Sequence, residues 1–280
     1  MESEKAKLYI VGTPIGNLGD ITYRAVETLK AVDFVCAEDT RVTAKLLNFL
    51  EIKKPLVSHH EHNKKPSCEA VANRILSGES CALVTDAGMP CISDPGEEMV
   101  KYCAGMGIEV VVVPGPSAAI SALAISGLDT SRFSFQGFLS MNRPSRFEQL
   151  ENAANIPDTL IFYEAPHKLR ATLDDMLKIF GDRKISLCRE LTKIHEQVIR
   201  TTIAQAVERY ENELPKGEYV LIIEGCKNEA ATETLEDAIA QAKALAAKGM
   251  KKADAAKHIA KISGFSKSEI YSALLENSDE

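Results

Sequence analysis

Residues 8–20 read LYIVGTPIGNLGD, an apolar run followed directly by a loop that holds three glycines and a proline. An apolar run that ends at such a turn is typical of a buried strand that passes into a helix. The glycine spacing, G-x-x-x-G-x-x-G, differs from both the dinucleotide fingerprint and the P-loop. Pro14 stands where the fingerprint requires its second glycine, and proline has no backbone N–H to donate. The loop is therefore not predicted to bind a phosphate.

The alternation of strand and helix continues along the first part of the chain. Short β-rich apolar runs at 33–37, 55–58, 81–85 and 108–113 alternate with segments of helical periodicity. Repeated alternation of this kind predicts a mainly parallel sheet with helices on both faces. We expect residues 1–118 to form an α/β N-terminal domain.

The pattern changes after residue 118. Strand follows strand at 184–201 without a helix between them, which predicts a mixed sheet in a second, α+β domain over residues 119–229. From about residue 230 the periodicity is helical throughout. We expect residues 230–280 to form a separate helical appendage.

Charge and cysteine usage limit the classes of function. The 280-residue chain has a net charge of −7, yet residues 243–267 hold seven lysines and one acid, Asp254. The seven cysteines never form C-x-x-C, which favours reduced thiols and no metal site. No apolar run approaches the ~18 residues of a membrane span, and the N-terminus shows no secretion signal. We expect a cytoplasmic protein that does not interact with membranes.

Four loops that follow predicted strands are rich in glycine, proline, aspartate and small residues. In open α/β sheets, ligands bind beyond the carboxyl ends of the strands, and small residues let the backbone approach a ligand closely. These loops therefore predict a ligand trough. They are GTPIGN (12–17), AEDTR (37–41), TDAGMPCISDPG (85–96) and PGPSA (114–118).

These loops, followed in order by further motifs, resemble the ribosomal RNA small subunit methyltransferase I family of the tetrapyrrole methylase superfamily. The further motifs are HEHN (60–63), TLIFYEAPHK (159–168), RELTK (189–193) and KGEYV (216–220). The resemblance extends over nearly the whole chain. It implies a two-domain, tetrapyrrole-methylase-like enzyme that binds S-adenosylmethionine between its domains and methylates the ribose 2′-hydroxyl of a cytidine in 16S rRNA. It also implies that rRNA or the 30S subunit is the partner and that the enzyme is a homodimer.

The resemblance assigns the cofactor trough to particular residues. A sulfonium is cationic and favours apolar walls and carbonyl oxygens, so Pro14 at the border of the trough is no obstacle. The backbone near Glu164 in the second domain is expected to close the trough. The other expected cofactor residues are Asp86, Ala87, Gly88 and Ile92 of the third loop, and Ser117 and Ala118 of the fourth.

Which residues act in the transfer stays open, because a ribose hydroxyl needs a base or a cation beside its developing oxyanion and several residues qualify. Asp39 and Arg41 are candidates, although Asp39 could equally cap a helix while paired with Arg41. His60 is a candidate on the substrate side or a hydrogen-bonded loop residue. In RELTK, Arg189 and Lys193 could instead hold RNA phosphates, and Glu190 could hold Arg189 in place.

The C-terminal segment has the pattern of a helix-turn-helix. Residues 252–262 and 266–276 each place apolar side chains on one helical face, and Gly264 lies between them. An acidic protein needs a local basic patch to hold RNA. We therefore expect Lys252, Lys257 and Lys267 to contact phosphates; a plain helical hairpin with solvated lysines is the alternative.

Three other functions compete with an rRNA methyltransferase. A small-molecule methylase that acts on a tetrapyrrole would share the cofactor loops but would not need the basic tail. A non-catalytic, ligand-sensing regulator that binds nucleic acid would need the tail but leaves AEDTR, RELTK and KGEYV unexplained. A nicotinamide oxidoreductase is disfavoured by the spacing of the first glycine loop.

Overall fold

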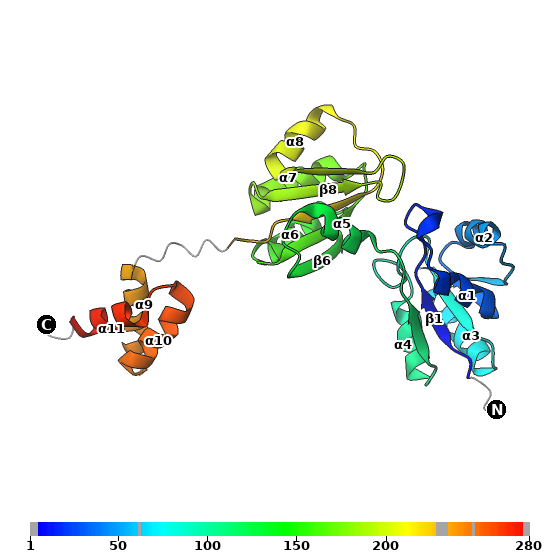
Figure 1. Ribbon diagram of the computed structural model, residues 1–280, viewed down its shortest axis with the longest axis horizontal. Coiled ribbons are helices and arrows are strands. Elements are labelled where there is room, and N and C mark those ends of the chain that lie inside the picture. The colour runs from blue at the N-terminus through cyan, green and yellow to red at the C-terminus, as the bar shows by residue number, and fades with distance from the viewer. Residues whose placement is uncertain (1–4, 61–62, 228–234, 248–249, 277–280) are drawn as a thin grey trace. The chain divides into compact units, whose positions relative to one another are not determined.

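The computed structural model describes residues 5–60, 63–227, 235–247 and 250–276 (Figure 1). The chain divides into two compact units, Met1–Gly225 and Cys226–Glu280. The first unit contains two sheets, so the expected boundary near residue 118 falls inside one compact unit.

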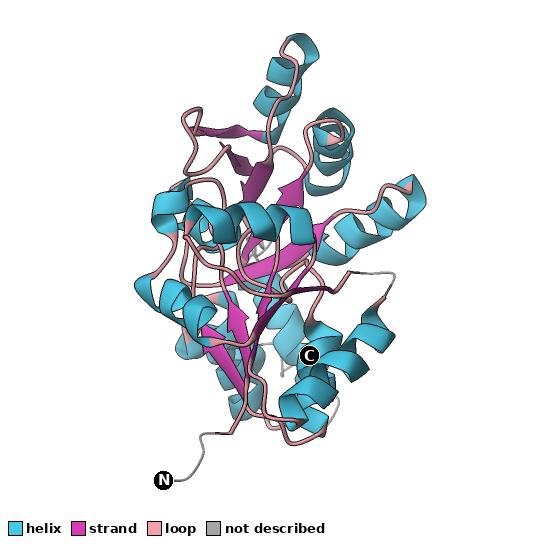
Figure 2. Ribbon diagram, turned by 90° about the vertical axis from the view of Figure 1, so that its right-hand side faces the viewer, coloured by secondary structure: helices cyan, strands magenta, loops and turns pink. Residues whose placement is uncertain are grey.

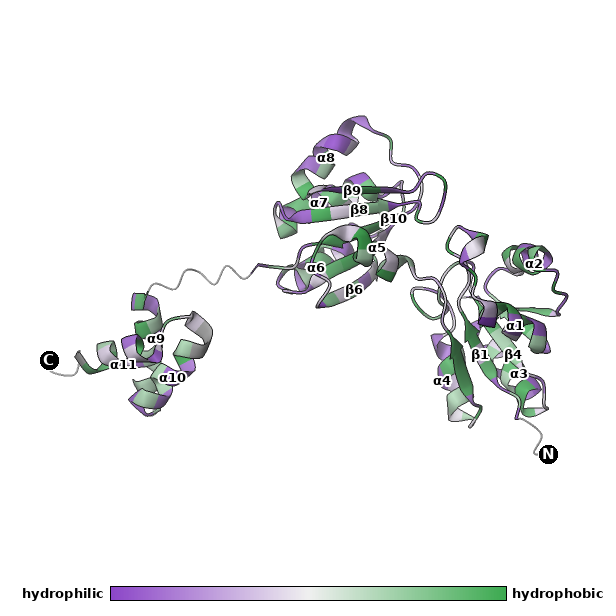
Figure 3. Ribbon diagram, in the orientation of Figure 1, coloured by the Kyte–Doolittle hydropathy of each residue, from purple (hydrophilic) through white to green (hydrophobic). Residues whose placement is uncertain are grey.

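The first sheet is parallel, as predicted, with the strand order β3-β2-β4-β1-β5. One face is covered by α3 and α4, through a core that includes Ile10 and Cys36. The other is covered by α1 and α2, through a core that includes Val11 and Val35. Neighbouring residues of one strand thus point to opposite faces of the sheet. Because both faces are buried, these strands are apolar throughout (Figure 3). The elements are β1 (Leu8–Val11), η1 (Leu18–Asp20), α1 (Tyr23–Ala31), β2 (Phe34–Ala37), α2 (Thr40–Phe49), β3 (Leu56–Ser58), α3 (Lys64–Leu76), β4 (Cys81–Val84), α4 (Glu97–Gly105) and β5 (Val110–Val113).

The second sheet is mixed, which confirms the second sequence prediction. Its order is β6-β7-β10-β8-β9, with β6 parallel to β7 and the other pairs antiparallel. Helix α5 packs on one face and α6, α7 and α8 on the other. Figure 2 shows magenta strands flanked by cyan helices. The elements are α5 (Ala118–Ser126), β6 (Phe133–Phe138), α6 (Arg143–Ala154), β7 (Thr159–Glu164), α7 (Leu169–Phe180), β8 (Lys184–Arg189), β9 (Gln197–Thr202), α8 (Ile203–Asn212) and β10 (Tyr219–Ile223).

The second unit consists of α9 (Leu235–Ala247), α10 (Lys252–Ser263) and α11 (Lys267–Glu276) around a small core of alanine, isoleucine and leucine. Gly264 ends α10 with φ 75°. Ser266 and Glu269 form a capping box: the Glu269 N–H donates to the Ser266 hydroxyl (3.2 Å), and the Ser266 N–H donates to the Glu269 carboxylate (3.0 Å). Phe265 packs against the core. The predicted helices and turn are confirmed.

The helices in the described ranges are all too short or too polar to cross a membrane.

Candidate active site

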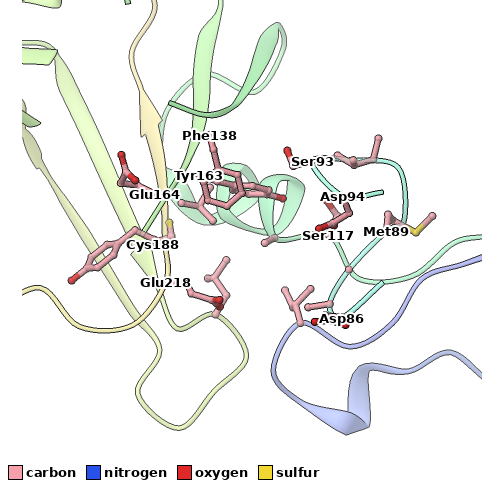
Figure 4. Close-up of a pocket in the computed structure, with 18 of the residues that line it drawn as sticks. Asp86, Met89, Ser93, Asp94, Ser117, Phe138, Tyr163, Glu164, Cys188 and Glu218 are labelled. Carbon is pink, nitrogen blue, oxygen red and sulfur yellow. The ribbon is translucent and has the colours of Figure 1, made fainter. Parts of the chain in front are cut away.

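A cavity of about 410 Å³ lies within the first unit, where the loops after β1, β2, β4 and β5 face residues of the second sheet (Figure 4). Its volume falls in the range of small-molecule sites, roughly 300–1,000 Å³. The first wall is formed by Ile15, Glu38, Asp86, Ala87, Gly88, Met89, Ile92, Ser93, Asp94, Ser117 and Ala118. The second wall is formed by Phe138, Tyr163, Glu164, Ala165, Cys188, Glu190, Leu191, Lys193, Glu218, Tyr219 and Val220.

The glycines after β1 let three loops pack closely beside the cavity. A Cβ atom on Gly12 would lie 2.7 Å from the Cα of Gly115, a distance that real Cβ atoms do not show. Thr13 and Gly88 exchange backbone hydrogen bonds of 2.9 and 3.1 Å. A Cβ on Gly16 would lie 2.6 Å from Cγ of Lys193, in the second wall. The first glycine loop therefore serves close packing around the cavity.

Backbone strain is concentrated in two loops of the cavity. Of the five non-glycine residues with positive φ in the described ranges, Cys91 (72°) and Ser93 (64°) belong to the loop after β4. Glu190 (50°) and Thr192 (67°) belong to the turn between β8 and β9. Such conformations cost free energy and persist only where the surrounding structure holds them, which is common at functional sites.

Three carboxylates gather on the first wall. The Thr85 hydroxyl donates to Glu38 Oε2 (2.7 Å), and the Asp39 N–H donates to Asp86 Oδ1 (3.2 Å). Burial and then the charge of Glu38 raise the pKa of Asp86. The same two causes raise the pKa of Asp94 to about 6. The first wall is thus acidic and suits a cationic ligand.

On the second wall, the Glu164 side chain is held by its own domain. Its Oε2 accepts from the Thr172 hydroxyl (2.5 Å), and its Oε1 accepts from the Ala165 N–H (2.8 Å). The side chain is buried, and Lys168 Nζ lies 3.8 Å from Oε1. The Tyr163 hydroxyl accepts from the Ala119 N–H (3.2 Å), which links β7 to α5.

Lys193 is held between two carboxylates at the cavity. Its Nζ lies 3.0 Å from Glu190 Oε1 and 3.4 Å from Glu218 Oε2. Burial lowers the pKa of Lys193, but the hydrogen bond to Glu190 and the charge of Glu218 outweigh it, and the pKa is raised. A Cβ on Gly217 would lie 2.5 Å from the Glu190 Cγ, so the glycine of KGEYV makes room for this arrangement.

The structure brings most of the predicted cofactor residues together. Pro14 is outside the cavity lining, and its neighbour Ile15 lies in it. The predicted residues that line the cavity are Asp86, Ala87, Gly88, Ile92, Ser117, Ala118 and Glu164. Their contacts with a cofactor stay predictions.

The predicted transfer residues are divided. Glu190 and Lys193 line the cavity. Asp39 lies next to it, caps α2 through the Arg41 N–H (2.8 Å) and pairs with the Arg41 guanidinium (2.6 Å). Its hydrogen bonds with Arg41 lower the pKa of Asp39 to about 2, which favours the capping interpretation because a carboxylate with so low a pKa is a poor proton acceptor. Arg189 does not line the cavity, and its buried Nε has no hydrogen-bond partner.

The predicted substrate residues lie outside the cavity lining. The His60 N–H donates to Asn63 Oδ1 (2.8 Å) in the loop before α3, while residues 61 and 62 of the HEHN motif lie outside the described residues. Lys257 and Lys267 are exposed on α10 and α11. Lys252 Nζ donates to the Leu274 carbonyl (3.1 Å), so this lysine also joins α10 to α11.

Several lining residues were absent from the sequence prediction. Glu38 and Asp94 stand inside two of the loops that were singled out, so acidity in those loops was the available signal. Most of the other missed residues also lie in quoted motifs, but no pattern within a motif separates a lining residue from a core residue. They are Ile15, Met89, Ser93, Phe138, Tyr163, Ala165, Cys188, Leu191, Glu218, Tyr219 and Val220.

Known structures and family models define the class of fold. A family model described as "Tetrapyrrole (Corrin/Porphyrin) Methylases" matches residues 7–207. A crystal structure of diphthine synthase is similar at a TM-score of 0.63 and 14% identity, over 79% of this chain and 90% of that one. Uroporphyrin III C-methyl transferase from Thermus thermophilus is similar at 0.57 and 17%, over 78% and 97%. The fold is that of the tetrapyrrole methylases.

Curated relatives narrow this class. Proteins named ribosomal RNA small subunit methyltransferase I are 50% identical in Halalkalibacterium halodurans, over 79% of this chain and 77% of that one, and 43% identical in Synechocystis sp., over 96% and 97%. The namesake in Bacillus subtilis is 47% identical over 83% and 80%. The chain belongs to the ribosomal RNA small subunit methyltransferase I family. It is a methyltransferase, and S-adenosylmethionine is its methyl donor.

The cavity residues fit this cofactor. Apolar side chains, among them Ile15, Ile92 and Leu191, suit the sulfonium and the carbon skeleton. Glu38 and Asp86 add negative charge opposite a ligand that carries a sulfonium and an ammonium group. Gly88, with φ 83°, adds no side chain to the cavity wall.

Proposed function

We propose that this protein transfers a methyl group from S-adenosylmethionine to the ribose 2′-oxygen of a cytidine in 16S rRNA. The observation that carries the proposal is an acidic cofactor-sized cavity in a chain that is 43% identical, over 96% of its length, to a relative named for small-subunit ribosomal RNA. Residues 243–267 of the helical unit, with seven lysines and one acid, support an RNA substrate, because this stretch supplies cations to an otherwise acidic chain.

The cofactor supplies an activated methyl group, so the protein has to position the ribose and exclude water. In this proposal the loop after β4 and the PGPSA loop hold the cofactor. Lys193 stabilises the developing oxyanion or a neighbouring phosphate, and Glu190 holds Lys193 in place (3.0 Å). Arg189 binds an RNA phosphate from outside the cavity. The pair of Asp39 and Arg41 shapes the edge of the first wall.

The second unit is proposed to hold the RNA. Lys257 and Lys267 are exposed residues and are assigned to phosphate contacts. Lys252 is assigned a phosphate contact in addition to its bond with α11. His60 is placed on the RNA side by the family resemblance alone.

The remaining parts of the proposal concern assembly and compartment. The family resemblance supports a homodimer, with the 30S subunit or free rRNA as substrate in the cytoplasm. Sedimentation of the purified protein tests the dimer. Methylation assays on free 16S rRNA and on 30S subunits, compared at equal RNA concentration, identify the substrate form.

A transfer assay tests the activity itself. Purified protein and radiolabelled S-adenosylmethionine are incubated with 16S rRNA from cells that lack the gene, and in parallel with a porphyrinoid. We expect label in the RNA alone, mapped by ribose-methylation sequencing to one cytidine. Label in the porphyrinoid, or on an RNA base, would contradict the proposal. Cofactor binding without transfer to either would favour a ligand-sensing regulator.

A further inference from the structure

Six carboxylates line the cavity in the described part of the chain, and three of them are committed on the second wall. Both oxygens of Glu164 accept hydrogen bonds from its own domain, from Ala165 and Thr172. Glu190 and Glu218 share the Lys193 ammonium, at 3.0 and 3.4 Å. A carboxylate that is held by a cation or by buried donors is a poor proton acceptor.

The first wall leaves one carboxylate available. Asp86 accepts from the Asp39 N–H (3.2 Å), and Glu38 accepts the single hydroxyl proton of Thr85 (2.7 Å). Asp94 is in hydrogen-bonding reach of the same Thr85 hydroxyl. Within the described ranges, Asp94 forms no ion pair and accepts no backbone N–H. Its oxygens therefore remain free to accept a proton from a ligand in the cavity.

The backbone fixes Asp94 at the cavity wall. Ser93, the residue before it, has φ 64°, and a Cβ on Gly137 would lie 3.3 Å from the Ser93 hydroxyl oxygen. The loop after β4 thus packs against the bulge of β6, where the register with β7 shifts. Figure 4 shows Asp94 beside Ser93 and Ser117, on the wall that faces Tyr163. A strained loop that is held in this way keeps a reacting group in one position.

The groups around Asp94 favour its protonated form. The charges of Glu38 and Asp86, from the loops after β2 and β4, raise the pKa of Asp94, and the hydrogen bond from Thr85 lowers it. Tyr163 of β7 and Cys91 of the same loop also face Asp94, whose charge raises the pKa of both groups. None of these groups is a cation. Burial and the charge of Glu38 raise the pKa of Asp94 to about 6. A carboxylate with a pKa near the working pH is ionised at neutrality and still basic enough to accept a proton in the transition state.

We propose that Asp94 is the catalytic base of the methyl transfer, an inference that rests on the proposed function. As the ribose 2′-oxygen bonds to the methyl carbon, the carbon–sulfur bond breaks and its electron pair goes to sulfur. The proton of the 2′-hydroxyl passes to a carboxylate oxygen of Asp94. Asp94 then releases this proton to solvent, which restores the carboxylate for the next turnover.

The test measures single-turnover methylation of 16S rRNA at saturating S-adenosylmethionine between pH 5 and 8. For the unmodified protein we expect the rate to fall about tenfold per pH unit below pH ~6. Asp94→Asn should lower the rate at pH 7.5 by about 10²- to 10⁴-fold and remove this pH dependence. Asp94→Glu keeps a carboxylate and should recover part of the rate. Asp174→Asn, on the exposed side of α7, is the matched control and should behave like the unmodified protein.

A binding measurement and a titration, neither of which requires methyl transfer, accompany the rate measurements. Calorimetry should show that Asp94→Asn still binds S-adenosylmethionine. Carboxyl NMR of the full chain, labelled with ¹³C-aspartate, should show one signal that titrates near pH 6 and is missing in Asp94→Asn. A rate within threefold of the unmodified protein at saturating cofactor, or an unchanged pH profile, would overturn the assignment of Asp94 alone. An unmodified protein that transfers no methyl group to RNA would overturn the proposed function and this inference with it.

Discussion

Around the cavity of the first unit, Cys91, Ser93, Glu190 and Thr192 hold φ angles between 50° and 72°. In the described part of the second unit, the one residue with positive φ is Gly264, at an ordinary helix end. Long-range packing fixes the cavity loops, whereas local capping and a small alanine core fix the tail. Substitutions in the cavity loops should therefore change cofactor binding and rate, and substitutions on the tail surface should change mainly RNA affinity.

The largest expected effect tests whether the cavity loops tolerate a side chain. Gly88→Val places a β-branched residue at φ 83°, against Ile15 at the cavity wall. Strain and lost space together should weaken S-adenosylmethionine binding by at least ~100-fold while the protein stays folded. Calorimetry measures the affinity and circular dichroism the fold. Unchanged affinity would show that this wall does not contact the cofactor.

Lys193 lines the cavity and Arg189 does not, so variants of the two residues compare a position inside the cavity with one outside it. Lys193→Ala removes the cation between Glu190 and Glu218 and should lower methyl transfer by about 10²-fold. Arg189→Ala should lower it by about tenfold, through a phosphate contact alone. Cofactor affinity should change little in both variants. A loss of cofactor binding in either would assign that residue to the cofactor.

Asp94→Asn should also stabilise the fold, because the folded state raises the pKa of this carboxyl to about 6. Because its pKa is raised in the folded state, the protonated carboxyl contributes its full stabilisation below the pKa of the unfolded state, near 4. This stabilisation is lost as the pH rises through ~6. The shift would correspond to ~3 kcal/mol at full burial, and solvent screening of this half-buried group reduces the expected gain to ~1 kcal/mol at pH 7.5.

Thermal unfolding at two pH values checks this prediction. The variant should be more stable than the unmodified protein at pH 7.5 and equally stable at pH 4. If Asp94→Asn were more stable than the unmodified protein at pH 4 but not at pH 7.5, the fold would have to lower the pKa of Asp94. That result would contradict the environment described for Asp94.

The smallest expected effects concern the lysines of the tail. Lys257→Ala and Lys267→Ala should each reduce the salt dependence of RNA binding by about one phosphate contact, ~0.7–0.9 in the slope of log K against log salt. Lys252→Ala should do the same and also destabilise the tail by ~1 kcal/mol, because its Nζ binds the Leu274 carbonyl. Filter binding across a salt series gives the slopes. Three unchanged slopes would leave the lysines as solvated surface residues.

The two regions also differ in how far the sequence predicts them. In the tail, the helix ends are set by Gly264, Ser266 and Glu269 through contacts between residues close in sequence. The helices and the turn could therefore be predicted correctly. The parallel sheet was equally readable, because burial on both faces gives uniformly apolar strands. Helix α5 was not predicted, since its run of small and apolar residues has no polar face to mark a helical period.

The cavity was predictable only in part. The sequence identifies the loop after β4 as a ligand loop through Asp86 and Gly88, two of the residues that line the wall. Tyr163 and Val220 depend on the pairing of β7 with β10, where Val220 lies opposite Tyr163. Register between strands that are far apart in sequence is set by the folded sheet. Both residues lie in quoted motifs, TLIFYEAPHK and KGEYV, but no pattern within those motifs marks them as lining residues rather than core residues.

The division of labour between the two units is the central claim, and one paired titration tests it most directly. A protein that lacks residues 230–280 and the full chain are each titrated with S-adenosylmethionine by calorimetry and with 16S rRNA in a salt series. We predict equal affinity for the cofactor and much weaker, less salt-dependent RNA binding by the shortened protein. Undiminished binding and methylation of RNA by the shortened protein would contradict the claim and leave the tail a structural hairpin.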